Sequence, residues 1–421
     1  MALGRGFTGI VLAIGVIGLT SGCSNLLEVD LPGVVEASSL DNPALSTLLV
    51  ESAIASFECA YTHYTAGSSA QSDELWHISG GQIYREWGGR WINGQNDYYV
   101  RGECTASGYG NYVITQTARF LAKDAYEKIS SFPAAEVTGD PTELMATASA
   151  YEGYSLLLLG EQYCTMAIDG GAELQPSAVM SMAEEKFQRA IQTGSADIKN
   201  MASVGLGRAL RAKGDLAGAA AAVSSVPEGF DYGASRDDSD YGRRNLIYND
   251  QRAYTNFTVA PTYRGVTWKG DMDPRVETFF QGIKPEYGAE RWSSTKYSSQ
   301  ADPIPLATWD EAQLIIAENA GGQTAVDIIN AFHTRAGLQP FDPAVDIVAG
   351  PSSDNIQNMV IETRRRELFL EGGHRLADLN HYNMAYPGKT PGDVDHLGRQ
   401  YGSTTCWPLP DLEKSSNPNI G

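Results

Sequence analysis

The chain has 421 residues, of which 42% are hydrophobic, so it can bury a large core as one large domain or two ordinary ones. Its formal net charge of -20 argues against an electrostatic nucleic-acid binder, because neutralising phosphates requires clustered Lys and Arg. Neutral or cationic ligands remain compatible with this charge.

The first 23 residues are typical of an export signal. Arg5 precedes an uncharged apolar stretch from Phe7 to Leu19, which is too short to span a bilayer comfortably. Small residues then lead up to Cys23, as in a bacterial lipoprotein signal. We therefore predict that residues 1–22 are a signal peptide and that Cys23 is lipidated, which would hold the protein on a membrane surface. The alternative is an ordinary cleaved signal in which Cys23 is incidental.

Four cysteines follow this segment. An even number in an exported chain predicts two disulfides, and four cysteines allow three pairings that sequence leaves open. We favour Cys59 with Cys104, the nearer pair, and Cys164 with Cys406, which would pin the C-terminal segment to the middle of the chain. None of them sits in a CxxC pair, so we expect no metal site.

Helix is predicted for most of the mature chain. Asn42 or Asp41 can cap a helix that has Pro43 in its first turn and apolar positions at helical spacing as far as Tyr64. A second helix fits residues 112–130. Four more helical segments, joined by short turns, run from Pro141 to residue 227, and they predict antiparallel helix pairs.

Small residues recur inside these predicted pairs. Small residues stand where two helices would need close contact, at Ala190, Gly205, Ala209 and Gly214. A Gly-Asp dipeptide turns the chain between helices. The pattern resembles tetratricopeptide helix pairs, which bury their apolar faces by stacking on their neighbours. The alternative is an unrelated helical bundle.

Two long segments, 66–109 and 229–305, have little helical period. The second is rich in Gly, Asp, Asn, Tyr and Trp, and the first is similar, so both are predicted to form loops and short strands. They are too long to be mere connections, and long irregular insertions with aromatic residues tend to be functional.

Helix is predicted again over 308–320, 324–338 and from about Asn355 to Glu371. On the last of these, charged residues continue the apolar face that begins with Ile356 and Val360. Buried charges cost several kcal/mol each unless they are paired. We therefore predict a structural ion network in which Arg364 pairs with Glu367, Arg375 pairs with Glu371 or Asp378, and Glu362 reaches Arg365 or Arg366 on the outer side. A catalytic role for these charges is the alternative.

Several segments together resemble the SusD/RagB family of outer-membrane nutrient-binding lipoproteins. They are "TWDEAQLIIAENA", "AVDIINAFHTRAGL", "IETRRRELFLEGGHRLADLNHY" and "CWPLPDLEKSSNPNIG", with the earlier "CSNLLEVDLPG" and "SDEL". The match runs from Cys23 to the end. Ala377 stands where an aromatic residue is common in the family, Gly372 and Gly373 are doubled, and the chain is short for the family.

The resemblance implies a mostly α-helical fold. Tetratricopeptide-like helix pairs would form an α-α superhelical scaffold over about 110–226 and 306–382, inside a single domain spanning 23–421. The irregular regions 66–109 and 229–305 would carry the ligand site.

The resemblance also implies a function. The protein would be lipid-anchored at the outer membrane on the cell surface, would bind an oligosaccharide or a peptide, and would deliver it to a SusC-like TonB-dependent transporter. No cofactor, nucleic acid or catalytic activity is expected, and the sequence contains no GxSxG, HExxH, phosphate-loop or EF-hand pattern. A glycan hydrolase, which would need two converging carboxylates, and a protein-binding helical scaffold are the alternatives.

A sugar site needs an apolar platform for the C–H faces of a ring, with amides and carboxylates for its hydroxyls, and Trp and Tyr supply a rigid face with a polar tip. The candidate ligand residues are Trp87, Trp91, Asn93, Asn96, Tyr98 and Tyr99 in the first irregular region and Trp268, Asp271, Trp292 and Tyr297 in the second. We expect the two regions to converge on one shallow site. The alternative is that each tryptophan covers the local core.

Overall fold

The computed structural model describes residues 40–95, 104 and 110–420. The chain divides into two compact units, Met1–Asp41 and Asn42–Gly421, and the helices and strands of the described residues named below lie in the second. The predicted signal peptide and Cys23 lie outside the described residues, so lipidation stays a prediction. Among the described residues, no helix is both long and apolar enough to cross a membrane.

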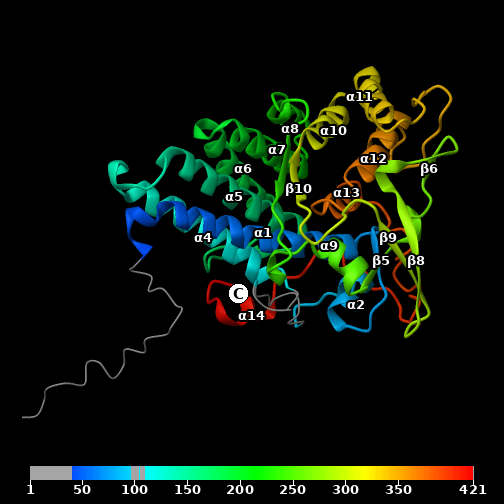
Figure 1. Ribbon diagram of the computed structural model, residues 1–421, viewed down its shortest axis with the longest axis horizontal. Coiled ribbons are helices and arrows are strands. Elements are labelled where there is room, and N and C mark those ends of the chain that lie inside the picture. Colours follow the sequence, from blue (N-terminus) through cyan, green and yellow to red (C-terminus); the bar gives the residue numbers. More distant parts are fainter. Residues whose placement is uncertain (1–39, 96–103, 105–109, 421) are drawn as a thin grey trace, which may run out of the picture. The chain divides into compact units, whose positions relative to one another are not determined.

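The central element is α1 (Ser46–Gln71), which begins where the sequence predicts a helix start. The Asn42 side chain accepts a hydrogen bond of 3.0 Å from the Ala44 N–H, and Pro43 opens a short 3-10 turn that leads into α1. From Phe57 to Gln71, every residue of α1 is buried. A helix buried on all sides belongs to the core, and Figure 1 shows α1 in blue with α4 and α5 beside it.

Five helices then follow in succession, and each packs against the next. They are α4 (Tyr112–Ser131), α5 (Pro141–Gln162), α6 (Pro176–Thr193), α7 (Ala196–Ala212) and α8 (Leu216–Val223). The side chains of Asp140, Ser195 and Asp215 cap α5, α7 and α8 by accepting backbone N–H bonds. This succession confirms the predicted helix pairs (Figure 1).

Small residues do permit close packing between these helices. A Cβ on Gly205 of α7 would lie 2.5 Å from the Phe187 ring of α6, so a larger side chain would clash there. Ala190 and Ala209 are fully buried. Gly214 does not share this role, because a Cβ there would meet no atom within 4 Å, and its φ of 85° instead turns the chain between α7 and α8.

The remaining helices are α2 (Gln82–Gly89), α9 (Leu246–Tyr248), α10 (Trp309–Ala320), α11 (Gly322–Arg335), α12 (Asn355–Glu367), α13 (His374–His381) and α14 (Asp411–Ser416). Helix α10 packs on α8, and α11 and α12 pack on α10. The helix predicted from Asn355 to Glu371 ends early, at Glu367. Leu370, Gly372 and Gly373 have positive φ angles, which end a helix and turn the chain into α13.

The described strands form antiparallel pairs. These are β1 (Leu75–His77) with β5 (Phe257–Val259), β2 (Met166–Ala167) with β3 (Glu173–Leu174), β4 (Asp231–Ala234) with β10 (Ile304–Thr308), β6 (Thr267–Trp268) with β7 (Asp271–Met272), and β8 (Thr278–Lys284) with β9 (Ala289–Ser294). Short strands therefore occupy the second irregular region as predicted. The first is more helical than predicted, because it contains the end of α1 and all of α2.

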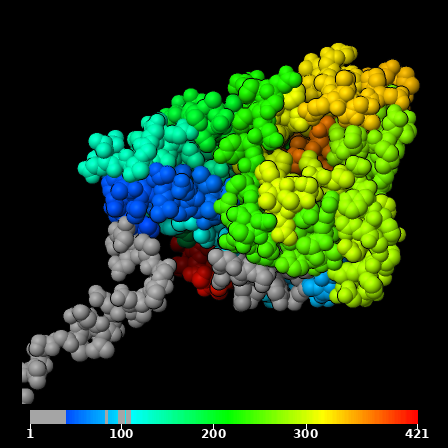
Figure 2. All heavy atoms as spheres, viewed as in Figure 1, coloured from blue at the N-terminus to red at the C-terminus, as the bar shows by residue number. Residues whose placement is uncertain are grey.

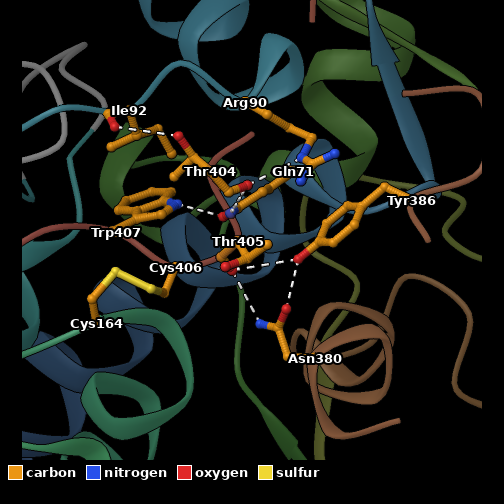
Figure 3. The surroundings of a disulfide bond; sticks show 10 residues. All are labelled: Gln71, Arg90, Ile92, Cys164, Asn380, Tyr386, Thr404, Thr405, Cys406 and Trp407. Carbon is orange, nitrogen blue, oxygen red and sulfur yellow. Dashed lines mark hydrogen bonds between the residues drawn. A yellow bond between two sulfur atoms is a disulfide. The ribbon is translucent and has the colours of Figure 1, made fainter. Parts of the chain in front are cut away.

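Both predicted disulfides are confirmed. Cys59 is bonded to Cys104, and Cys164 is bonded to Cys406. Figure 3 shows the second bond, and beside it the Cys164 N–H donates to the Trp407 carbonyl at 2.8 Å. The C-terminal segment is therefore attached to the end of α5, as the pairing implies.

The predicted ion network is present, but its pairings differ from those predicted. Arg364 pairs with Asp378 at 3.0 Å rather than with Glu367, and Arg375 pairs with Asp73 at 2.5 Å rather than with Glu371 or Asp378. The cause is the early end of α12, because α13 then folds back and brings Asp378 against Arg364. The pairing predicted for Glu362 on the outer side of the helix is present, since Glu362 contacts both Arg365 and Arg366 at 2.8 Å.

The other two acidic members of the network face the second irregular region. Glu367 accepts hydrogen bonds from Arg275 at 3.0 Å and Arg335 at 3.1 Å, and Glu371 pairs with Lys296. Arg275 and Lys296 belong to the second irregular region and Arg335 ends α11, whereas Glu367 ends α12 and Glu371 follows it. The network thus connects the C-terminal helices to the rest of the core.

Candidate functional site

The β8–β9 hairpin carries an exposed aromatic face. Strand pairing sets Phe280 opposite Trp292 and Ile283 opposite Glu290, and alternate side chains of β9 share a face. The Phe280 and Trp292 ring centroids are 5.4 Å apart. Phe280 and Ile283 each keep 50% of their surface exposed, and Trp292 is half-buried. Atoms of this hairpin, yellow-green in Figure 2, lie at the surface along the right-hand edge.

Two charged side chains border the Trp292 ring. The Glu290 carboxylate accepts the indole N–H of Trp292 at 3.1 Å and a guanidinium N–H of Arg264 at 2.7 Å. The Arg264 guanidinium lies 5.4 Å from the centre of the Trp292 ring. Partial burial lowers the pKa of Arg264 despite the nearby Glu290, but an arginine stays charged. We call Arg264, Phe280, Ile283, Glu290 and Trp292 the hairpin platform.

The platform is fixed from behind. The Trp292 backbone N–H donates to the Thr258 hydroxyl of β5 at 2.8 Å, and Arg252 donates to the Ser294 carbonyl at 2.8 Å. The Arg252 guanidinium also lies 4.7 Å from the centre of the Phe279 ring. A rigid apolar surface bordered by a carboxylate and a guanidinium can stack against a sugar ring and hydrogen-bond its hydroxyls.

Trp87 and Tyr297 do not fit the predicted ligand role. Trp87 is 1% exposed and its ring stacks on Trp407 with centroids 5.3 Å apart. Tyr297 is 4% exposed and donates its hydroxyl to the Leu370 carbonyl at 3.0 Å. Both side chains belong to the core, so neither offers a ring to a surface ligand.

The other predicted ligand residues of the first region lie near the end of α2 or beyond. Trp91 is 37% exposed. Asn93 is exposed, and its side-chain oxygen accepts the Gln95 N–H at 3.1 Å. Asn96, Tyr98 and Tyr99 lie outside the described residues.

Trp268 and Asp271 belong to the β6–β7 turn. The Trp268 indole N–H donates to the Gln339 carbonyl at 2.8 Å, and its ring packs against His333. Asp271 accepts a hydrogen bond of 3.2 Å from the Gln339 amide. Trp268 therefore covers the end of α11, while Trp87 lies in the core and Trp292 lies on the hairpin. These three tryptophans therefore do not share one surface, and convergence of the two irregular regions on one site stays a prediction.

Four residues of the hairpin platform were not among the predicted ligand residues, namely Phe280, Ile283, Glu290 and Arg264. A signal was present, because Phe279 to Lys284 and Ala289 to Ser294 flank a short turn that contains Pro285 and Gly288. Reading that hairpin would have placed Phe280 beside Trp292. The attachment of Arg264 depends on tertiary contacts that the turn does not reveal.

Two carboxylates of the core have strongly raised pKa values. Burial raises the pKa of both Glu74 and Glu311 to about 7. Glu311 lies 3.7 Å from His374, and burial together with nearby arginines lowers the pKa of this histidine well below its usual value. Such shifts also arise in structural ion networks. Within the described residues, no group of three or more His, Cys, Asp or Glu side chains could hold a metal ion.

No family model matches this chain, and no curated protein does. Solved structures do match. A SusD homolog from Bacteroides thetaiotaomicron has a TM-score of 0.69 at 13% identity, with 92% of this chain and 98% of that one covered. A SusD-like carbohydrate-binding protein from Bacteroides vulgatus has a TM-score of 0.66 at 15% identity, with 89% and 96% covered.

A third solved structure is a laminarin-binding SusD-like protein, with a TM-score of 0.62 at 16% identity and coverage of 88% of this chain and 98% of that one. At these identities the likeness shows the fold. The protein therefore has the SusD-like fold over nearly its whole length, which confirms the mostly α-helical, tetratricopeptide-like architecture that the sequence resemblance implies.

Proposed function

We propose that this protein is a lipoprotein of the outer-membrane surface that binds an uncharged oligosaccharide without cleaving it and delivers it to a SusC-like TonB-dependent transporter. The observation that carries the proposal is the exposed aromatic hairpin platform on a SusD-like fold. Two solved structures of this fold are named for binding carbohydrate, one of them for binding laminarin.

The platform fits a neutral sugar better than a charged ligand. Glu290 and Arg264 already neutralise each other, so neither is left to pair with a ligand charge. Their remaining lone pairs and N–H groups, at the edge of Trp292, can still hydrogen-bond hydroxyls. The formal charge of -20 also repels anionic ligands at long range.

The test is calorimetry of the detergent-solubilised full chain with laminarihexaose, cellohexaose and maltohexaose. We expect a micromolar dissociation constant, about 8 kcal/mol, for at least one of them, because a protein that delivers its ligand must also release it. Phe280→Ala should weaken binding roughly tenfold or more, since a stacked ring buries apolar area. Phe120→Ala is the matched control, because Phe120 lies on α4 and is equally exposed, at 51% against 50%.

Three outcomes would contradict the proposal. Binding that survives Phe280→Ala and Trp292→Ala would remove the platform from the site. Shortened saccharides in the calorimeter cell after the titration would favour a glycan hydrolase. Binding of peptides but of no saccharide would reassign the ligand class.

Delivery requires a transporter partner. Cross-linking in cells that express the full chain should capture a TonB-dependent outer-membrane protein, and deleting that partner should abolish uptake of the bound saccharide. Capture of other surface proteins, with no saccharide bound, would favour a protein-binding scaffold.

A further inference from the structure

Two adjoining cavities form a groove on the helical scaffold. Their volumes are about 510 and 440 Å³, and they share Gly160, Glu161, Gln175, Pro176 and Asn380. Each volume falls within the range of small-molecule sites. The groove lies between the end of α5, the start of α6, the end of α7 and α13. We call it the α5–α13 groove, and none of the hairpin platform residues lines it.

The charged side chains at the base of the groove are already paired. Glu161 accepts two hydrogen bonds from the Arg208 guanidinium, at 2.7 and 2.6 Å. Arg211 pairs with Asp378 at 2.9 Å and with Glu318 at 2.5 Å. The arginines are buried, with about 4% and 5% of their side-chain surface exposed. Because the charges compensate one another, an ionic ligand would have to compete with an existing salt bridge.

Neutral polar groups are available along the walls. The Gln175 amide and the Ser177 hydroxyl are exposed at the start of α6, and neither side chain makes a hydrogen bond to another described residue. Glu161 adds a carboxylate whose two oxygens receive three hydrogen bonds, from Arg208 and from the Tyr64 hydroxyl, which leaves acceptor capacity. Met180 and Pro176 provide apolar surface between these groups.

The far end of the groove is rigid. The Asn380 amide donates to the Thr405 carbonyl at 3.0 Å, and its oxygen accepts the Tyr386 hydroxyl at 2.7 Å. Figure 3 shows Asn380 and Tyr386 on one side of Thr405 and the Cys164–Cys406 disulfide on the other. A ligand entering this end would meet groups that are already held in place, which lowers the entropy lost on binding.

We infer that the α5–α13 groove is a second binding site, separate from the hairpin platform, for a short uncharged polyhydroxylated ligand such as an oligosaccharide. The reasons are its compensated charges, its free amide and hydroxyl groups, its apolar strip and its two connected compartments. The inference does not rest on the proposed function, because the two sites share no residue.

Ala377 offers a direct way to close the groove. On α13, Ala377, Asn380 and His381 stand three and four residues apart, so they share one face, and that face lines the groove. The methyl group of Ala377 leaves space that a larger side chain would fill. Ala377→Trp should therefore block the ligand. Ala221→Trp on α8 is the matched control, because Ala221 is exposed and does not line the groove.

The test measures protection from hydroxyl-radical oxidation by mass spectrometry, on the detergent-solubilised full chain with laminarihexaose, cellohexaose or maltohexaose at millimolar concentrations. We expect at least one hexasaccharide to protect His381 and Met384, which line the two compartments. This protection should persist in Phe280→Ala and Ala221→Trp and disappear in Ala377→Trp. Protection of Phe280 and Trp292 reports on the hairpin platform separately, so the two proposals can fail independently.

Two results would overturn the inference. One is that no hexasaccharide protects His381 and Met384 in the wild-type chain. The other is protection that survives in a folded Ala377→Trp variant. If that variant does not fold, Gln175→Ala decides, because Gln175 is exposed and its side chain makes no hydrogen bond to another described residue. It should weaken binding in the groove roughly three- to tenfold, as expected for one lost neutral hydrogen bond, and an unchanged affinity would contradict the inference.

Discussion

Removing Asp378 should destabilise the protein far more than removing Glu367, although both are buried carboxylates of the same ion network. Asp378 accepts a hydrogen bond from Arg364 at 3.0 Å and forms an ion pair with Arg211 at 2.9 Å. Burial alone would raise the pKa of Asp378, but Arg364 and Arg211 outweigh it and lower the pKa, so the carboxylate is charged. In Asp378→Ala, Arg211 keeps Glu318, whereas Arg364, with 2% of its side chain exposed, loses its carboxylate partner.

The size of this effect follows from the stranded charge. Breaking a buried pair by removing one partner costs about 3–5 kcal/mol, and we expect that loss in Asp378→Ala. Glu367→Ala strands no charge, because Arg275 keeps Asp273 and Arg335 keeps Asp310. Burial also raises the pKa of Glu367, so its removal relieves a desolvation cost. We therefore expect a loss no larger than about 1.5 kcal/mol, the lower value for one charged hydrogen bond.

The assay is urea unfolding of both variants and the wild type, followed by tryptophan fluorescence. The urea midpoint should fall more in Asp378→Ala than in Glu367→Ala. The slope of the unfolding free energy against urea concentration should stay unchanged, which would show that the unfolded state is the same. If Glu367→Ala costs as much as Asp378→Ala, the assignment of partners described above is wrong.

Three further predictions concern separate parts of the protein. Burial raises the pKa of Glu311 from 4.5 to about 7, so the stability that Glu311 contributes is full below pH 4.5 and is lost as the pH rises through 7. In urea unfolding, the free energy of unfolding of Glu311→Gln relative to the wild type should therefore rise by about 3 kcal/mol from pH 4.5 to pH 7.5. Cys23→Ala should release the protein from membranes and change its intact mass, and membrane binding with unchanged mass would exclude lipidation. Gly205→Ala should cost about 1–3 kcal/mol, measured by urea unfolding, because the added Cβ meets the Phe187 ring; a neutral result would mean that α6 and α7 can separate at no cost.

Local features of the sequence predicted the helical scaffold well. The Asn42 cap, the following proline and the apolar spacing determine where α1 begins. Gly205 marks a close contact because only a small residue fits beneath Phe187. These signals act over one or two helical turns, so they can be read without knowing the tertiary structure.

Pairings between distant segments could not be predicted in the same way. Arg375 pairs with Asp73, which is 302 residues away in the sequence, whereas the predicted partners lay within the same helical stretch. Similarly, a tryptophan in a glycine-rich segment is compatible with either a ligand site or the core, and Trp87 lies in the core because it stacks on Trp407. Both outcomes depend on how remote segments pack.

The buried charges of the ion network connect three parts of the core. Asp73 and Glu74 follow α1; Asp73 accepts from Arg375 of α13, and Glu74 accepts the N–H of Leu370, which lies between α12 and α13. Lys389, from the C-terminal region, donates to the Leu75 carbonyl at 2.9 Å. None of these residues belongs to the hairpin platform, so changes in the ion network should alter stability while leaving ligand affinity of the folded protein unchanged. If the hairpin platform binds a saccharide as proposed, its pre-organised groups would bind without a large entropic loss, and the exposed Phe280 ring would leave the ligand a short path to release.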